Sequence, residues 1–227
     1  MVSGLLVPDN KCRIFNRYKP TQAVQTTADA SPWLNHLRLL YPTDADHMLA
    51  WFAYKLQNAG KKANHALVLG GSQGIGKDLL LSPIRYAAGA GNVAEINPTD
   101  FFSDFHPFVE STLLVVNEAR DMGDADKFKL YDVMKRFIAA PPETLTCNRK
   151  HQEAYEVPNV MGVLITSNRK LNGLFIDPDD RRHYVAWSCA ERQPVAYCEL
   201  SASWSHFVFG VMAPVNFRHK GATLCSA

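Results

Sequence analysis

The chain has 227 residues, of which 47% are hydrophobic and 20% are charged, as in an ordinary globular protein with one sizeable core. Its 24 basic and 22 acidic residues leave a net charge of +2, which restricts any nucleic-acid binding to a local patch. The five cysteines form no C-x-x-C pair and match no zinc spacing, so we expect reduced thiols rather than a disulfide framework. No signal peptide and no apolar run of ~20 residues is present, and we expect a cytoplasmic protein with no membrane partner.

Residues 1–32 are predicted to form an arm or linker. The segment from Lys11 to Lys19 is basic, and the polar, alanine-rich stretch that follows favours a solvated linker over a binding arm. A helical pattern then occupies residues 43–58. Thr43 and Asp46 have the spacing of a capping box, and the apolar side chains of this segment fall on one face, as in a helix that packs on a core.

Short apolar runs alternate with helical segments over the middle of the chain. The predicted strands are His65–Leu69, Val93–Ile96, Thr112–Val116 and Gly162–Thr166. Asp78–Ala88 and Ala125–Phe137 have helical spacing, although Pro83 should kink or shorten the first of these helices. This alternation predicts an α/β fold with three layers and a mostly parallel sheet.

A β-hairpin is predicted within residues 144–158, inserted before the last of these strands. Its polar tip carries Arg149, Lys150 and His151. Charged hairpin tips often serve solubility alone, but three basic groups can also contact a nucleic-acid backbone. Residues 189–227 lack clear periodicity, and we assign them no fold.

A glycine-rich loop joins the first predicted strand of this series to the helix that follows it. Its sequence is Gly71-Ser72-Gln73-Gly74-Ile75-Gly76-Lys77, which has the form G-x-x-x-x-G-K. In such a loop backbone N–H groups and the helix N-terminus face phosphate oxygens, and the lysine contacts the β- and γ-phosphates. We therefore predict a P-loop that binds a nucleotide. Asp78 stands where a serine or threonine usually ligates Mg²⁺, and its carboxylate is also a hard oxygen ligand, so the substitution bears on hydrolysis more than on binding.

Two of the buried strands end in polar residues that suit phosphoryl-transfer chemistry. Asn117 and Glu118 follow the strand at 112–116, as in a Walker B element, where Asn117 would serve the metal and Glu118 would polarise the attacking water. Asn168 follows the strand at 162–166 and would contact the γ-phosphate and the lytic water. The alternatives are an ordinary polar strand end for the first pair and a turn-forming asparagine for Asn168.

Two adjacent arginines, Arg181 and Arg182, follow a pair of aspartates a short loop after Asn168. Neighbouring arginines are often solvated or paired with nearby acids. An arginine supplied to the nucleotide of an adjacent subunit would instead stabilise the charge that develops during phosphoryl transfer. We predict this role for Arg181 or Arg182.

The order of these motifs resembles that of superfamily 3 helicases, the AAA+-like ATPases of viral and plasmid replication. The resemblance covers roughly residues 15–187 and is strongest to the helicase domain of phage and plasmid primase-polymerases. The segments that carry it are Phe15-Asn16-Arg17-Tyr18, Trp51, Gly70 to Asp78, Phe105-His106-Pro107, Val157-Pro158-Asn159 and Thr166-Ser167-Asn168.

This resemblance implies an AAA+-like P-loop ATPase domain over residues 33–188, with 43–58 as its leading helix, and an unassigned, truncated C-terminal region after it. It implies a hexameric ring that uses ATP and Mg²⁺ to move along single-stranded or forked DNA beside a primase or polymerase, in the host-cell cytosol. Lys77, Glu118, Asn168 and one arginine of the pair would be catalytic, and Asp78, Asn117 and Glu118 would serve the metal. Lys150 and His151 would lie on a hairpin that lines the central channel.

The leading interpretation is therefore an ATP-dependent DNA helicase or translocase. A second is a nucleotide-binding module that assembles a replisome without unwinding DNA, because Asp78 and Asn117 replace the usual metal-binding hydroxyl and aspartate. A third is a P-loop kinase that acts on a small molecule. The order of the motifs and the lack of an arginine-rich lid disfavour this third interpretation.

Overall fold

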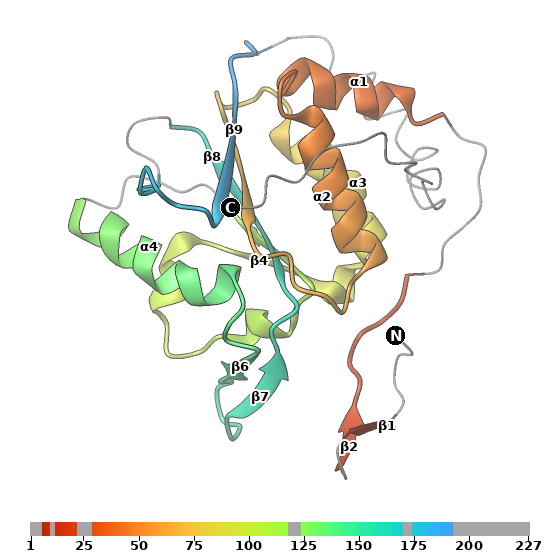
Figure 1. Cartoon of the computed structure of the whole chain (residues 1–227), viewed down its shortest axis with the longest axis vertical. Coiled ribbons are helices and arrows are strands. Elements are labelled where there is room, and N and C mark those ends of the chain that lie inside the picture. The colour runs from red at the N-terminus through yellow and green to blue at the C-terminus, as the bar shows by residue number, and fades with distance from the viewer. Residues whose placement is uncertain (1–5, 10–11, 22–28, 118–123, 170–173, 193–227) are drawn as a thin grey trace.

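The computed structural model describes residues 6–9, 12–21, 29–117, 124–169 and 174–192. Its centre is a sheet of five strands in the order β4-β5-β8-β3-β9 (Figure 1). All the pairings in this sheet are parallel. The strands are β3 (Ala66–Gly71), β4 (Val93–Ile96), β5 (Leu113–Val116), β8 (Gly162–Ser167) and β9 (His183–Ser188). The prediction of an α/β fold with a mostly parallel sheet is confirmed.

Helices cover both faces of this sheet (Figure 1). On one face lie α1 (Ser31–Leu40), α2 (Ala45–Gln57) and α3 (Lys77–Ala88), and on the other lies α4 (Asp124–Ile138). Short 3₁₀ helices, η1 (Ala90–Asn92), η2 (Pro98–Phe102) and η3 (Pro107–Glu110), stand in the connections on either side of β4. Among the described helices, none is long and apolar enough to cross a membrane.

The central strands are buried on both faces, which explains their continuous apolar runs. All six residues of β3 are buried. Because successive side chains of a strand point to opposite faces, Leu67 and Leu69 pack with α1, α2 and α3, whereas Val68 packs with α4. The glycine-rich loop at the end of β3 is therefore attached to a strand that is buried along its whole length.

Two antiparallel hairpins lie outside the central sheet. The strands β6 (Thr144–Cys147) and β7 (Tyr155–Pro158) form the hairpin that the sequence predicts. A second hairpin pairs β1 (Leu6–Asp9) with β2 (Cys12–Phe15) inside the segment expected to be an arm or linker.

The capping box predicted at the start of α2 does not form. The helix begins one residue later than that pattern requires, with Asp44 as its N-cap and no side-chain hydrogen bond to the helix end. Thr43 Oγ1 donates to Asp44 Oδ2 at 2.9 Å, and the Tyr184 hydroxyl donates to Asp44 Oδ1 at 2.7 Å. The Asp44 carboxylate thus joins α2 to β9.

Helix α3 is not shortened at Pro83, which lies inside its twelve residues. Proline removes one backbone hydrogen bond from a helix interior, but burial of Leu80, Leu81 and Ile84 against the sheet holds the helix together beyond it.

Part of the expected arm contacts the body of the chain. The Asn92 amide accepts a hydrogen bond from the Lys19 backbone N–H at 3.1 Å and donates one to the Lys19 carbonyl at 2.6 Å. Arg17 forms an ion pair with Glu110. Arg17 and Lys19 are exposed, and both are attached to the body of the chain by partners that lie far along the sequence.

Candidate nucleotide-binding site

A cavity of ≈ 650 Å³ opens at the carboxyl ends of β3, β4, β5 and β8. This volume lies in the range of small-molecule sites, roughly 300–1,000 Å³, and ligands of open α/β sheets bind at this edge. The lining residues are Gln73, Gly74, Gly76, Lys77, Asp78, Arg85, Glu95, Asn97, Asn117, Thr166 and Asn168. A nucleotide with its phosphates can be accommodated in this space.

The glycine-rich loop predicted to be a P-loop leaves β3 and turns directly into α3. Gly74 and Gly76 have φ angles of 81° and 100°, in the region that favours glycine, and Gly76 is the residue before the first turn of α3. The buried His36 of α1 lies behind this turn, with its Nε2 3.2 Å from the Gly76 carbonyl oxygen. A Cβ at Gly76 would stand 2.8 Å from the His36 ring. Helix α1 therefore contacts the loop through His36.

The P-loop lysine and the asparagine after β8 are in direct contact. Lys77 is buried, with 7% of its surface exposed, and its Nζ donates to Asn168 Oδ1 at 2.7 Å. The same ammonium donates to the carbonyls of Gly71 at 2.6 Å and Ser72 at 2.8 Å. Two residues that are 91 positions apart in the sequence thus meet at one wall of the cavity.

A chain of polar contacts crosses the opposite wall. Asn117 Nδ2 donates to Glu95 Oε2 at 3.1 Å, and Arg85 Nε lies 2.8 Å from Glu95 Oε1. Arg85 also reaches Asp78, with 3.8 Å between Nη2 and Oδ1. The predicted residues Asp78 and Asn117 are therefore linked through Arg85 and Glu95, which the sequence analysis did not single out. Glu118 lies outside the described residues.

A third residue that the sequence analysis missed approaches the P-loop from the end of β9. A Cβ at Gly74 would stand 3.3 Å from Arg192 Cδ and 3.4 Å from its Nε. The parallel pairing of Gly71 with Ser188 brings this segment to the loop. The sequence offers one indication that Glu95 belongs to the site, because an acid inside a short apolar strand is unusual. It offers no such indication for Arg85 or Arg192.

The two adjacent arginines lie at the other end of the sheet. The Ala66 backbone N–H donates to the Arg182 carbonyl at 2.8 Å, and Ala66 pairs with His183. Arg181 and Arg182 thus stand at the amino ends of β3 and β9, and the P-loop follows the carboxyl end of β3 about 20 Å away. Neither arginine faces the cavity of its own chain.

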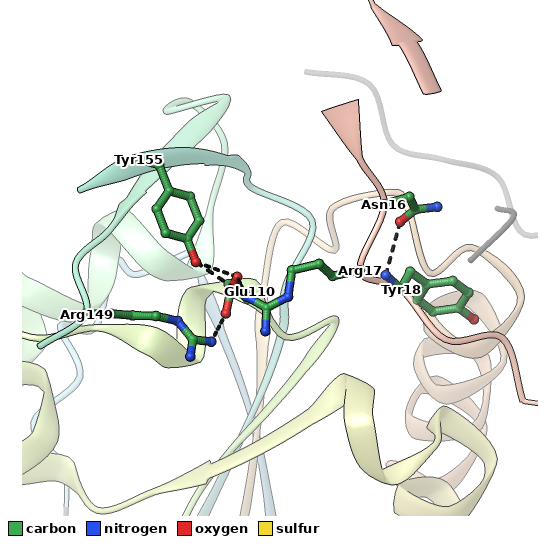
Figure 2. Close-up of polar contacts among 6 residues, drawn as sticks. All are labelled: Asn16, Arg17, Tyr18, Glu110, Arg149 and Tyr155. Atoms are coloured by element: carbon green, nitrogen blue, oxygen red, sulfur yellow. Dashed lines mark hydrogen bonds and ion pairs between the residues drawn. The ribbon is translucent and has the colours of Figure 1, made fainter. Parts of the chain in front are cut away.

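The residues predicted to bind nucleic acid separate into two environments. Lys150 and His151 are exposed at the tip of the β6–β7 hairpin. Arg149 instead forms an ion pair with Glu110, to which Arg17 and the Tyr155 hydroxyl also bind, the latter at 2.6 Å (Figure 2). Burial raises the pKa of Glu110, but the hydrogen bonds from Tyr155 and Arg149 and the charges of the two arginines outweigh it and leave the pKa below its ordinary value.

A known protein family matches the segment that contains the cavity. The sequence pattern of DUF5906, a family of unknown function, matches residues 69–182, which are half of the chain. The chain belongs to this family. In this DUF5906 chain the matched segment runs from β3 to the residue before β9, so it includes the P-loop, Glu95, Asn117 and Asn168.

The DUF5906 chain is also similar to a phage replication protein. It is 27% identical over 180 residues to the DNA primase-polymerase of Nitratiruptor phage NrS-1, and the alignment covers 76% of this chain and 24% of that protein. Two structures of the apo C-terminal region of NrS-1 share its fold, with TM-scores of 0.74 and 0.70 and sequence identities of 22% and 23%. Each of these matches covers 89% of this chain and 51% of that region. The chain thus spans about a quarter of the phage protein and about half of its solved region.

Proposed function

We propose that this chain is the ATP-binding motor domain of a phage replication protein and acts as a DNA helicase or translocase. The observation that carries this proposal is the hydrogen bond between Lys77 and Asn168 at a cavity that Asn117 also lines. A P-loop lysine, a metal-side amide and a γ-phosphate sensor are the groups that nucleotide hydrolysis needs at one place. On the basis of the resemblance to superfamily 3 helicases, we also propose an AAA+-like, three-layer P-loop core, a hexameric ring and single-stranded or forked DNA as the substrate.

Sequence similarity to the phage primase-polymerase supports a role in DNA replication. That relative is a DNA primase-polymerase, so a primase or polymerase is the partner that we propose for this chain. Lys150 and His151, exposed at the hairpin tip, are proposed to contact the DNA backbone.

The residues around the cavity have distinct tasks in this proposal. When a nucleotide binds, the Lys77 ammonium exchanges its hydrogen bonds to the loop carbonyls for hydrogen bonds to phosphate oxygens. Asn168 holds the Lys77 ammonium at the cavity. Asp78 and Asn117 offer oxygen atoms to Mg²⁺, which neutralises phosphate charge when it is bound. Glu118 polarises the attacking water.

A second candidate is a nucleotide-binding assembly module without a motor activity. Two observations favour it. The Asn117 amide replaces the carboxylate that usually serves the metal, and the exposed Asp78 replaces a hydroxyl. Both changes weaken catalysis more than they weaken the binding of phosphates by the loop.

Turnover of ATP with and without single-stranded DNA tests the proposal on the wild type and on Lys77→Ala. We expect DNA to stimulate hydrolysis, and we expect Lys77→Ala to lower turnover by roughly a hundredfold, because an oriented charge is lost from the transferred phosphate. Lys61→Ala, which changes an exposed lysine outside the cavity, is the matched control and should leave turnover unchanged. Nucleotide binding without any turnover would favour the assembly module, and hydrolysis unaffected by Lys77→Ala would contradict both candidates.

A further inference from the structure

Glu95 is an acidic residue that the fold places beside the metal-side amide of the cavity. It lies on β4, opposite Val115 of β5, and Ile96 accepts the backbone hydrogen bond of Asn117 at 2.9 Å. Its Oε2 accepts a hydrogen bond from the Asn117 side chain at 3.1 Å. The amide of Asn117 thus uses its N–H₂ group on Glu95, which leaves its oxygen atom for a cation.

Arg85 of α3 forms an ion pair with Glu95 of β4. The guanidinium extends from α3, with its Nε 2.8 Å from Glu95 Oε1 and its Nη2 3.8 Å from Asp78 Oδ1. The Glu95 side chain is 46% exposed and that of Asp78 is 76% exposed, whereas that of Arg85 is only 22% exposed. Both carboxylates are therefore oriented by the same cation and still reach the cavity.

The oxygen atoms of this wall suit Mg²⁺ that arrives with phosphates. Within the described residues, no three His, Cys, Asp or Glu side chains gather closely enough to hold a metal ion by themselves. Mg²⁺ in nucleotide sites is commonly bound by one or two carboxylates together with the phosphates and water. The Asn117 amide brings no negative charge, so among the described residues that line the cavity the carboxylate charge comes from Asp78 and Glu95.

We infer that Glu95 supplies carboxylate charge that makes nucleotide binding at this cavity dependent on Mg²⁺, because position 117 holds an amide in place of an acid. This inference rests on the proposed function and deepens it. Glu95 orients Asn117 through its hydrogen bond and faces the cation, directly or through a bound water. Without Mg²⁺, the same negative charge repels the phosphates.

The test is a titration of a fluorescent ATP analogue, in excess Mg²⁺ and again in EDTA, on the full chain. Glu95→Gln keeps the size of the side chain and one of its two oxygen acceptors, but removes the charge. We expect Glu95→Gln to lower the affinity in Mg²⁺ by roughly tenfold or more, as for other residues beside metal ligands. In EDTA we expect its affinity to equal or exceed that of the wild type.

Two further variants separate this role from a structural one. Arg85→Gln removes the ion pair but not the carboxylate, and should weaken binding with and without Mg²⁺, because a cation leaves a phosphate site. Glu143→Gln makes the same charge change at an exposed position outside the cavity and should alter neither affinity. Thermal unfolding of each variant establishes that it is folded.

The outcomes distinguish the inference from the proposal on which it rests. A loss in Glu95→Gln that is equal in Mg²⁺ and EDTA, or a loss specific to Mg²⁺ in Arg85→Gln as well, would overturn the role of Glu95 and leave nucleotide binding in place. A wild-type chain that binds no nucleotide in either condition would overturn the proposed function, and the role of Glu95 with it.

Discussion

Gly70 stands one residue before the P-loop, and an aromatic ring occupies the space next to it. Gly70 pairs with Trp187 of β9, and a Cβ added to Gly70 would lie 2.1 Å from Trp187 Cε3. The Tyr41 hydroxyl donates to the Gly70 carbonyl at 3.2 Å on the buried side. The end of β3 is thus enclosed by side chains from β9 and from the segment between α1 and α2.

We predict that Gly70→Ala lowers the free energy of unfolding by about 1–3 kcal/mol, because the Trp187 ring or the strand must move to admit a methyl group. Unfolding in denaturant measures this change. Gly91→Ala is the control, since its Cβ would meet only Lys19 Cδ, at an ordinary 3.5 Å. Equal stability of the two variants would contradict the packing argument.

At the same scale, the sequence predicted some residues of the site and missed others. Lys77 was found because its role depends on a local pattern in which the loop, strand and helix are contiguous. Glu95 was missed because its role depends on Asn117, which lies 22 residues later and meets it only through the pairing of β4 with β5.

Among the elements, Lys55 of α2 and Lys62 of the loop after it contact the turn before β8. Lys55 is buried and Lys62 is half-buried, and no carboxylate of the described residues forms an ion pair with either. Lys55 Nζ donates to the carbonyls of Ala59 at 3.2 Å, Lys61 at 2.8 Å and Val160 at 2.5 Å. Lys62 Nζ donates to the Met161 carbonyl at 2.7 Å and to that of Phe137. Burial lowers the pKa of Lys55 to about 8, and burial together with the charge of Lys55 lowers that of Lys62 to about 7.

We predict that the free energy of unfolding rises between about pH 7 and about pH 9. Each lysine has an ordinary pKa of 10.5 when unfolded and a lower one when folded, so the unfolded chain binds more protons over this window. Denaturant unfolding at both pH values should show a smaller rise in Lys62→Met than in the wild type. Lys61→Met, at an exposed position, should retain the full rise, and an identical rise in all three proteins would contradict the assignment.

The hairpin shows how an element can be predicted while the role of its residues changes. The sequence predicts two short strands on either side of a polar tip, and the structure confirms both strands as β6 and β7. Pairing with Glu110 directs Arg149 away from the tip and toward Arg17 of the arm (Figure 2). Of the three basic residues predicted to contact DNA, only Lys150 and His151 are left at the exposed tip.

For the whole molecule, the position of Arg181 and Arg182 sets a geometric condition on the proposed motor. They stand at the amino ends of β3 and β9, a strand length from the cavity of their own chain. An arginine from this pair can reach a nucleotide only in another copy, and this requirement agrees with the proposed ring.

Mixing two inactive variants tests this arrangement. We predict that Lys77→Ala and the double variant Arg181→Ala with Arg182→Ala are each inactive alone, and that an equal mixture recovers up to about a quarter of wild-type ATP turnover. Random mixing places an intact P-loop next to an intact arginine pair at that fraction of the interfaces. A mixture with no more turnover than its components would contradict an arginine supplied in trans.

Local patterns in the sequence by themselves determined the glycine-rich loop between β3 and α3, the strands β3, β4, β5 and β8, the helices α2, α3 and α4, and the existence of the hairpin. Apolar runs, helical spacing and glycine positions are properties of contiguous residues, so no long-range contact is needed to recognise them. No prediction covers α1 or β9. Trp33, Leu37 and Leu40 of α1 have helical spacing, whereas β9 is buried at His183, Ala186 and Ser188, without regular alternation.

Only the tertiary structure decided which of these residues meet. The strand order β4-β5-β8-β3-β9 brings Asn168 to Lys77 and Glu95 to Asn117, and it keeps Arg182 at the far end of the sheet. Residues 17–19 are bound to the body by partners that lie about 70 to 90 positions away in the chain. Strand order and such contacts depend on the packing of the whole core, which no local pattern of residues encodes.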